Sequence, residues 1–431
     1  MRTICLLLAL MGTSLASAQS AYPATAKAAA TIEDQVIEWR HHLHQNPELS
    51  NREFETAKYV AKHLKGLGIE VKTGIAYTGV VGILRGGKPG GVIALRADMD
   101  ALPVVEDTGL PFASTVKTTY LGKDVGVMHA CGHDTHVAML MGAAEVLSKQ
   151  KADIPGTIVF LFQPAEEGAP KGEGGGAKMM VEQGVLTDHD VEVAFGIHIN
   201  SQTPIGHVNY KPGGTMAASN SYTIKVKGKQ AHGSRPWGGI DPIVASAQII
   251  MGLQTIISRQ TELTKEAAVI TVGKIDGGVR SNIIPEEVTM IGTIRTLDTE
   301  MRDKIFAKIK KTATLIAESS GASAEVTIDE GYPVTYNDPG ITRSLMPTVV
   351  KTVGEDNVHL IRAITGAEDF SFYAEKVPSL FVFLGGMDPA KDRSEVAGHH
   401  TPKFVIDDRG LKTGVELFVN VAMDYLQTKS R

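Results

Sequence analysis

Alternating blocks of apolar and polar residues predict a sheet with helices packed around it. Residues 31–44 and 53–67 carry apolar positions at helical spacing, and further helical stretches lie near 133–148 and 177–183. Short apolar runs of strand-like composition occur at 80–84, 92–95, 157–162, 193–199 and 380–384. Because helices and strands alternate, we predict an α/β fold, with a mainly parallel sheet covered by helices on both faces.

The pattern changes between residues 218 and 330. Residues 221–227 alternate polar and apolar positions, and Asp241-Pro242 forms an N-cap and first turn for a helix that runs to about Arg259. The next elements are strands at 268–274 and 288–296, a helix at 299–319 and a strand at 324–328. This β-α-β-β-α-β order is ferredoxin-like. We therefore predict one domain, residues 31–217 and 331–431, interrupted by a smaller α+β domain at 218–330.

The N-terminus has the pattern of an export signal. Arg2 gives a positive start, residues 4–11 are apolar, and Ala16-Ser17-Ala18 fits a cleavage site. We predict a signal peptide over residues 1–18, a loose leader over 19–30 that is rich in Ala, Ser and Thr, and a periplasmic or secreted protein. No later run approaches the roughly 20 apolar residues that span a bilayer, so no stable membrane anchor is expected.

Composition narrows the class of protein. Of 431 residues, 43 % are hydrophobic and 21 % charged, as in globular proteins. The formal net charge of −5 and the absence of a long basic run argue against nucleic-acid binding, which needs concentrated positive charge. Cleavage of the signal would leave Cys131 as the one cysteine of the mature chain. A lone thiol in an exported protein forms no internal disulfide and is kept for another reason, such as metal binding.

The segment HACGHDTH, residues 129–136, concentrates metal-ligand side chains. Cys131 and His133 are of the types that bind zinc-like ions, and Asp134 could hold an imidazole by a hydrogen bond. The mature chain lacks the second pair of cysteines that a structural finger needs. The alternative interpretation is a polar loop with a buried thiol.

A second group, QPAEEG at residues 163–168, follows the apolar run TIVFLF. Acidic residues at the carboxyl end of a strand lie where α/β proteins place their sites. Of two adjacent carboxylates, one can bind a metal while the other serves as general base. The alternative for Glu166 and Glu167 is a solvated turn.

Several residues are weaker candidates taken singly. His198 lies in an apolar strand, where a core histidine is the commoner explanation. His399 and His400 precede a turn proline, and we favour His400 as a ligand. The segment RADMDALP carries Asp98 and Asp100, whose carboxylates could orient ligands or shape the substrate pocket; the alternative is a salt-bridged strand end. In the smaller domain, the residues suited to bind a carboxylate or an oxyanion are His232, Asn282 and Arg295.

Six segments stand in the order found in one family. They are RADMDALP, MHACGHDTH, FQPAEEG, AHGSRP, GAEDF and HTPKF. In these segments the chain, from about residue 32 to 426, resembles the N-acyl-amino-acid amidohydrolases, which include hippurate hydrolase, thermostable aminoacylase-type carboxypeptidases and plant auxin-conjugate hydrolases. The resemblance implies a dinuclear metal site on the larger, catalytic domain. The implied ligands are Cys131, His133, Glu167, His198 and His400.

The resemblance also implies roles for other residues. Glu166 matches the general base, and His232 matches a histidine that reaches a neighbouring subunit's site and stabilises the oxyanion. Asn282 and Arg295 match contacts to the substrate carboxylate, while Asp98 and Asp134 are expected to orient the ligands. The inserted domain would mediate homodimerisation and act as a lid.

The implied reaction is hydrolysis of the amide bond of an N-acyl or N-aroyl amino acid by metal-activated water. A thiolate ligand favours manganese, zinc, cobalt or nickel over magnesium, two ions per subunit. The main alternative is an exported metallo-dipeptidase or carboxypeptidase that takes small peptides. A protein that binds metal or conjugates without turnover is a third possibility, against which the retained pair Glu166 and Glu167 argues.

Overall fold

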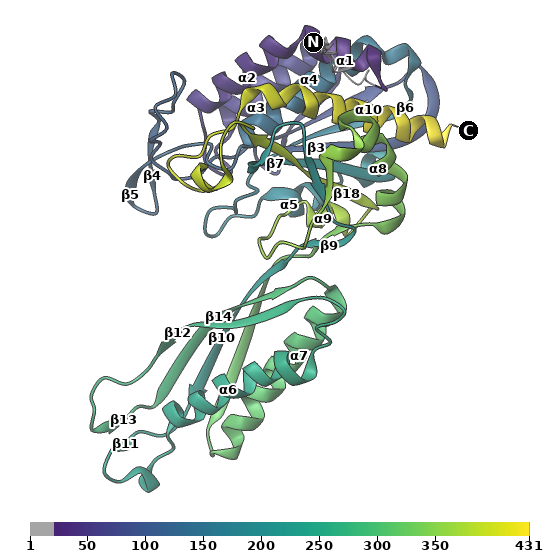
Figure 1. The fold of residues 1–431 in the computed structure, drawn as a ribbon. Coiled ribbons are helices and arrows are strands. Elements are labelled where there is room, and N and C mark those ends of the chain that lie inside the picture. Colours follow the sequence, from purple (N-terminus) through teal and green to yellow (C-terminus); the bar gives the residue numbers. More distant parts are fainter. Residues whose placement is uncertain (1–20, 431) are drawn as a thin grey trace, which may run out of the picture.

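The structure, a computed structural model, describes residues 21–430. The chain forms a larger domain that contains both ends of the described chain and a smaller domain made by its middle part (Figure 1). Between residues 21 and 430, no helix combines the length and the apolar character needed to cross a bilayer.

The larger domain is built on an eight-stranded sheet. In spatial order its strands are β1 (Glu70–Ile75), β2 (Gly79–Arg85), β6 (Pro155–Gln163), β3 (Lys88–Asp98), β7 (Val193–Pro204), β18 (Ser379–Met387), β8 (Val208–Tyr210) and β17 (Val358–Leu360). The central strands β6, β3, β7 and β18 pair in parallel, while β1, β2 and β8 join by antiparallel pairing. The five apolar runs predicted as strands all lie in this sheet.

Helices cover both faces of the large sheet. They are α1 (Pro23–Thr31), α2 (Glu33–Gln45), α3 (Phe54–Gly66), α4 (His133–Lys149), α5 (Gly176–Glu182), α8 (Pro339–Val353), α9 (Ser371–Ala374) and α10 (Leu411–Lys429). On β6, Ile158 and Phe160 pack with the core under α4 and α10, whereas Val159 and Leu161 pack with the core under α5 and α9. Burial of both faces explains why these strands read as unbroken apolar runs. The predicted α/β fold is confirmed.

The smaller domain is a four-stranded antiparallel sheet with two helices. Its elements in chain order are β10 (Ala218–Lys227), α6 (Pro242–Gln260), β12 (Ala268–Asp276), β14 (Glu287–Thr296), α7 (Thr299–Ser319) and β15 (Ser323–Tyr332). The spatial order β12-β14-β10-β15 is that of a ferredoxin-like unit. As expected from the sequence, the side chain of Asp241 caps α6 by accepting hydrogen bonds from Ile243 N and Val244 N.

Short elements complete the two domains. Strands β9 (Gly213–Met216) and β16 (Thr335–Asn337) pair where the chain passes between the domains, β11 (Ala231–His232) pairs with β13 (Ile283–Ile284), and β4 (Lys117–Tyr120) pairs with β5 (Lys123–Gly126). The 3₁₀ helices are Lys151–Asp153, Thr187–His189, Pro236–Gly238, Glu355–Asn357, Arg393–Glu395 and Asp408–Gly410.

The prediction of a loose leader over residues 19–30 is wrong for most of its length. Residues from Pro23 onward form helix α1, which packs against α10 and α4 and buries Ala29 to 1 % exposure. Alanine has the highest helix propensity, and proline is favoured in the first helical turn, so a composition that resembles a linker here forms a helix. The predicted signal peptide, residues 1–18, lies outside the described residues.

Candidate metal centre

The candidate centre lies at the carboxyl ends of the central parallel strands. Cys131 and Gly132 lead into α4, whose first residue is His133. Gly132 has a φ of 93°, and a Cβ there would lie 2.3 Å from Ile199 Cγ2 in β7. Only glycine fits this turn, because a side chain would be strained by the backbone and would clash with β7.

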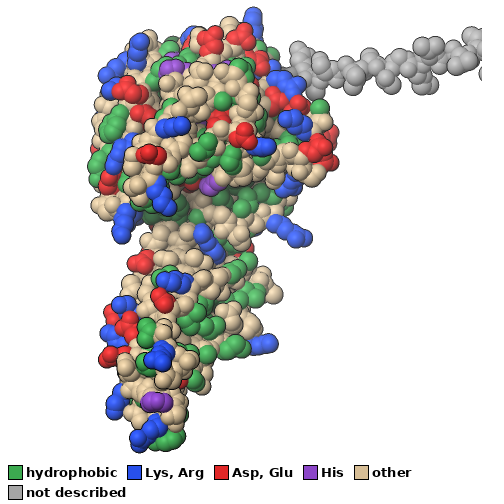
Figure 2. All heavy atoms as spheres, turned by 90° about the vertical axis from the view of Figure 1, so that its left-hand side faces the viewer, with side chains coloured by type: hydrophobic (Ala, Val, Ile, Leu, Met, Phe, Trp, Pro, Cys, Tyr) green, Lys and Arg blue, Asp and Glu red, His purple; other side chains and the backbone are tan. Residues whose placement is uncertain are grey.

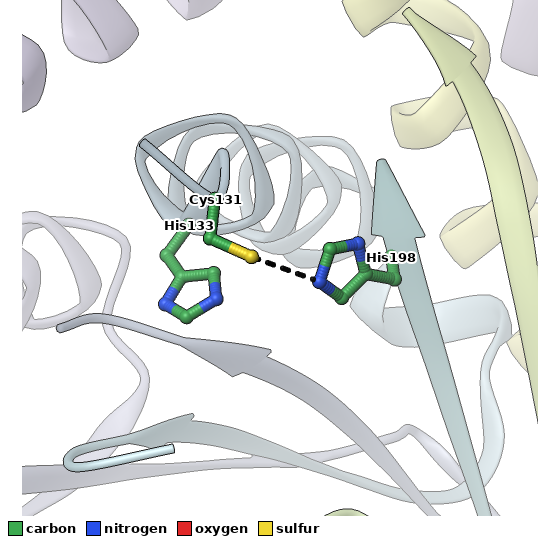
Figure 3. Close-up of side chains that lie close together, drawn as sticks. All are labelled: Cys131, His133 and His198. Atoms are coloured by element: carbon green, nitrogen blue, oxygen red, sulfur yellow. Dashed lines mark hydrogen bonds between the residues drawn. The ribbon is translucent and has the colours of Figure 1, made fainter. Parts of the chain in front are cut away.

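Side chains that are distant in sequence converge on the sulfur of Cys131. Its Sγ lies 3.5 Å from His198 Nε2 and 3.3 Å from His400 Nε2. Glu167 Oε1 lies 3.1 Å from His400 Nε2 and 4.0 Å from His133 Nε2. Figure 3 shows three of these side chains, with His133 on the first turn of α4 and His198 on β7. The structure thus brings all five predicted ligand residues together.

Hydrogen bonds fix which ring nitrogen each histidine presents. His133 Nδ1 lies 2.8 Å from the backbone oxygen of Asp100, and His198 Nδ1 lies 2.6 Å from that of Ile199. Because a carbonyl oxygen only accepts, these Nδ1 atoms donate, and the lone pair of each neutral ring is on the Nε2 that faces the cluster.

His399 is oriented differently from its neighbour His400. The backbone N–H of Ser201 donates to His399 Nε2 at 3.2 Å, so the hydrogen of the neutral ring is on Nδ1, 3.6 Å from Cys131 Sγ. His399 therefore points a hydrogen at the sulfur, whereas His400 points Nε2 at both Cys131 and Glu167. The geometry favours His400 over His399 as a metal ligand.

The centre concentrates buried negative charge. Burial, together with the carboxylates of Glu167 and Glu166, raises the pKa of the Cys131 thiol well above its usual value. Burial and the nearby Glu368 likewise raise the pKa of Glu166. At His133, burial is outweighed by the surrounding carboxylates, which raise its pKa to about 10. All three shifts describe a site that favours bound positive charge.

The residues present fit a divalent metal ion. His133 Nε2 is buried without a hydrogen-bond partner, although buried polar atoms are normally paired. Donor atoms within 4.8 Å of one another form several sets of three, including Cys131 with His133 and His198, and Cys131 with Glu167 and His400. Sulfur, imidazole nitrogen and carboxylate oxygen together suit first-row transition ions and zinc.

The two aspartates predicted to orient ligands contact different histidines. Asp98 accepts from Arg96 at 2.6 Å and lies 2.5 Å from His136 Nδ1 and 3.7 Å from His133 Nε2. Asp134 does hold an imidazole, but it is that of His44, at 2.8 Å, and it also accepts from Arg40.

The sequence analysis did not single out Asp100 among the carboxylates of RADMDALP. Its Oδ1 accepts from Glu166 N and its Oδ2 from Glu167 N, both at 3.0 Å. Its backbone oxygen accepts from His133, and Ser50 Oγ donates to Oδ2 at 2.7 Å. One buried residue thus fixes the backbone that carries the two candidate carboxylates and orients one candidate imidazole. Its position two residues after Asp98 in RADMDALP was the available signal.

The three candidates of the smaller domain do not reach this centre within the same chain. His232 is exposed on β11, beside Asn282, whose backbone oxygen accepts from Gly233 N at 2.9 Å. Arg295 is half-buried on β14, between Ser219 and Val269. None of the three lines the cavity of about 330 Å³ that contains Cys131 and Glu166.

Comparison with known proteins identifies a family of peptidases and several similar hydrolases. Residues 94–424 match peptidase family M20/M25/M40. Thermostable carboxypeptidase 2 of Saccharolobus solfataricus is 43 % identical over 89 % of this chain and 93 % of its own. The N-acetyl-L-cysteine deacetylase of Bacillus subtilis is 39 % identical over 88 % of this chain and 86 % of its own.

A solved structure shows the same architecture. It is a Bacillus subtilis protein described as a dinuclear metal-binding peptidase of the M20 family, with a TM-score of 0.77, 34 % identity, and coverage of 93 % of this chain and 99 % of its own.

The chain belongs to peptidase family M20/M25/M40. The resemblance found in the sequence is therefore confirmed, and this M20 protein is a metal-dependent hydrolase that acts on amide bonds.

The predicted export of this M20 enzyme is corrected by the same comparison. Relatives such as the N-acetylcysteine deacetylases of Bacillus subtilis are cytoplasmic enzymes. The prediction rested on a short apolar run and a small-residue triplet, and both lie outside the described residues. Such a run carries little information by itself, because its length does not distinguish an export signal from other apolar segments.

Asp100→Asn should weaken metal binding by about 10- to 100-fold, the range seen when partners of metal ligands are removed. An amide cannot accept from both Glu166 N and Glu167 N, because its nitrogen donates. Metal content after dialysis against graded chelator measures the effect. Asp107→Asn, at a side chain that is 74 % exposed, is the matched control. Equal metal retention by both variants would contradict the positioning role of Asp100.

Proposed function

We propose that this M20 enzyme hydrolyses the amide bond of N-acyl or N-aroyl amino acids, releasing a carboxylic acid and a free amino acid. The observation that carries the proposal is the position of Glu166. Its carboxylate is 3.9 Å from His133 Nε2, buried beside the cluster of metal-ligand atoms, with a raised pKa. A raised pKa suits a general base, which must accept a proton and give it back.

The cavity supports an acyl group as part of the substrate. Besides Glu166, its lining includes the apolar side chains of Ile199, Met216, Ile364 and Phe383. An apolar wall beside buried polar groups can hold a hydrocarbon substituent while the amide faces the carboxylates.

The residues proposed to hold two divalent ions are Cys131, His133, Glu167, His198 and His400. When bound, such ions would supply Lewis acidity, which polarises the amide carbonyl and lowers the pKa of a water. Manganese, zinc, cobalt and nickel all suit this donor set. The orientation of His133 and His198, with Nε2 toward the cluster, supports these assignments.

The protein's own groups then carry the protons. A carboxylate oxygen of Glu166 takes a proton from the attacking water and passes it to the amide nitrogen as the C–N bond breaks. The carboxylate regains its charge when the amine leaves. Cys131 is a proposed ligand and forms no covalent bond to substrate, so no acyl-enzyme is involved.

We further propose that a second copy of the chain completes the site. His232 is exposed on the smaller domain and does not line the cavity of its own chain. If it stabilises an oxyanion, as the family resemblance implies, it must reach the centre of another subunit. There it would donate to the amide oxygen as negative charge develops, while Asn282 and Arg295 are proposed contacts for the substrate carboxylate.

The smaller domain offers a surface for this homodimer. Strand β12 lies at the edge of its sheet, and Val269, Ile275 and Ile291 on and beside it are 41–49 % exposed. Figure 2 shows hydrophobic side chains along the smaller domain in a view toward the β12 side. An unpaired edge strand with exposed apolar residues is suited to pair with another chain.

A second candidate function is hydrolysis of small peptides. The 43 % identity to a protein named thermostable carboxypeptidase 2 favours it. The two functions share the metals and Glu166, and differ in whether an acyl group or an amino-acid residue occupies the cavity.

The test is amino-acid release by the purified protein loaded with manganese or zinc. The substrates are N-acetyl-methionine, hippurate and a set of dipeptides. We expect release from the acyl amino acids, abolished by chelator and restored by metal. Release from dipeptides alone would replace the first proposal with the second. Release that survives complete metal removal would contradict both.

Glu166→Gln should retain both metals yet lower kcat at least about 100-fold, because the amide cannot take a proton from water. Glu167→Gln is the matched comparison and should lose metal as well as activity. Metal analysis and steady-state kinetics distinguish the two. A Glu166→Gln enzyme with more than about a tenth of wild-type kcat would refute the base assignment.

Mixing two inactive variants tests the shared site. Each mixed dimer of a Glu166→Gln chain and a His232→Ala chain would contain one centre with both residues intact. After unfolding and refolding together in equal amounts, we expect about a quarter of wild-type activity, because about half of randomly formed dimers are mixed. Separately refolded variants are the control. Activity no higher than theirs would rule out a site shared between chains.

A further inference from the structure

Tyr332 connects the smaller domain to the backbone of Glu166. It is the last residue of β15, at the junction of the two domains, and its hydroxyl donates to the backbone oxygen of Glu166 at 2.6 Å. The side chain also lines the cavity that contains Cys131 and Glu166. The cavity is therefore lined by both domains, with Tyr332 from the smaller domain and Glu166 from the larger.

The turn that carries Glu166 is held from the other side by the larger domain. Ala165 has a left-handed φ of 52°, which an alanine adopts only under constraint. Its N–H donates to the buried Glu53 Oε1 at 2.9 Å, and the N–H of Glu166 donates to Asp100 Oδ1 at 3.0 Å. The two N–H groups of this strained turn are thus fixed by the larger domain, and the carbonyl of Glu166 by the smaller one.

The ring of Tyr332 has little freedom of its own. It packs edge-on against Phe372 in α9, with centroids 6.0 Å apart. The preceding Gly331 lies so close to β10 that a Cβ would be 2.1 Å from the backbone oxygen of Ser219. The position of the hydroxyl therefore follows the position of strands β10 and β15, which belong to the smaller domain.

We propose that Tyr332 is a positioning residue through which the smaller domain holds the Glu166 peptide in its working geometry. Its effect on turnover rests on the proposed role of Glu166 as general base. The hydrogen bond itself does not rest on that role, because it joins Tyr332 to the backbone of Glu166 whichever substrate the enzyme takes. A carboxylate placed on a strained turn depends on each of its backbone hydrogen bonds, and small displacements of a catalytic group are costly in rate.

The test uses the metal-loaded full-length enzyme and the variant Tyr332→Phe, which removes only the hydroxyl. We expect kcat to fall about ten-fold with KM within about two-fold, since loss of one hydrogen bond misplaces the base without changing substrate binding. We also expect faster backbone hydrogen exchange in peptides that cover residues 163–168, with metal content and Tm unchanged. Tyr336→Phe, at an exposed tyrosine four residues away, is the matched control.

Each outcome has a defined meaning. Unchanged kcat and unchanged exchange at 163–168 would overturn the proposal. A fall in Tm with exchange accelerated throughout the protein would also overturn it, because it would indicate a general structural role. If the wild type hydrolyses none of the acyl amino acids or dipeptides, the proposed function fails, and local exchange still decides the contact. Should Tyr332→Phe fold poorly, Phe372→Leu loosens the same ring and should accelerate exchange in the same segment.

Discussion

Buried negative charge at the carboxyl edge of the parallel sheet is the constraint around which this site is organised. Moving carboxylates out of water is costly unless they are paired. Arg96, itself fully buried, meets part of this cost by donating to Asp98, Glu368 and Asp369 at 2.6–2.9 Å. Among residues 21–430, no arginine donates to Glu166 or Glu167, whose basic neighbours are the imidazoles of His133 and His400. At this edge of the sheet, the guanidinium of Arg96 therefore balances one group of carboxylates, whereas Glu166 and Glu167 have no guanidinium partner.

The division of labour between the domains follows from this constraint. A rigid parallel sheet can hold Cys131, His198 and the carboxylates in fixed relation, because each lies within a strand, just after one, or just before a helix packed on the sheet. The smaller domain contributes no donor to the cluster in its own chain. It contributes Tyr332, whose hydroxyl donates to the backbone oxygen of Glu166 and not to a candidate metal ligand atom. Placement of Glu166, the proposed base, can therefore depend on the position of the smaller domain, whereas the donor cluster is held within the larger domain.

Much of the fold could be predicted because its elements repeat simple patterns. The apolar runs form strands of the large sheet, and the alternating residues 221–227 lie in β10, with their apolar side chains in the core. Helix α1 was missed because an alanine-rich composition was interpreted as a linker, although alanine favours helix. Asp100 was not distinguished from Asp98 for a different reason. Its importance lies in the two backbone N–H groups it accepts from, and no side-chain pattern specifies which backbone groups a carboxylate will meet.

The choice between His399 and His400 illustrates the same limit in one pair of residues. Adjacent histidines are equivalent ligands in a sequence, and only the neighbouring backbone distinguishes them. His400 has a left-handed φ of 62°, and its N–H donates to Ala130 O at 2.8 Å, which ties this turn to the segment that carries Cys131. In the same turn, His399 Nε2 accepts a hydrogen bond from the backbone N–H of Ser201. A single backbone conformation thus turns Nε2 of His400 toward the sulfur of Cys131 and the carboxylate of Glu167, and places His399 against the backbone of β7.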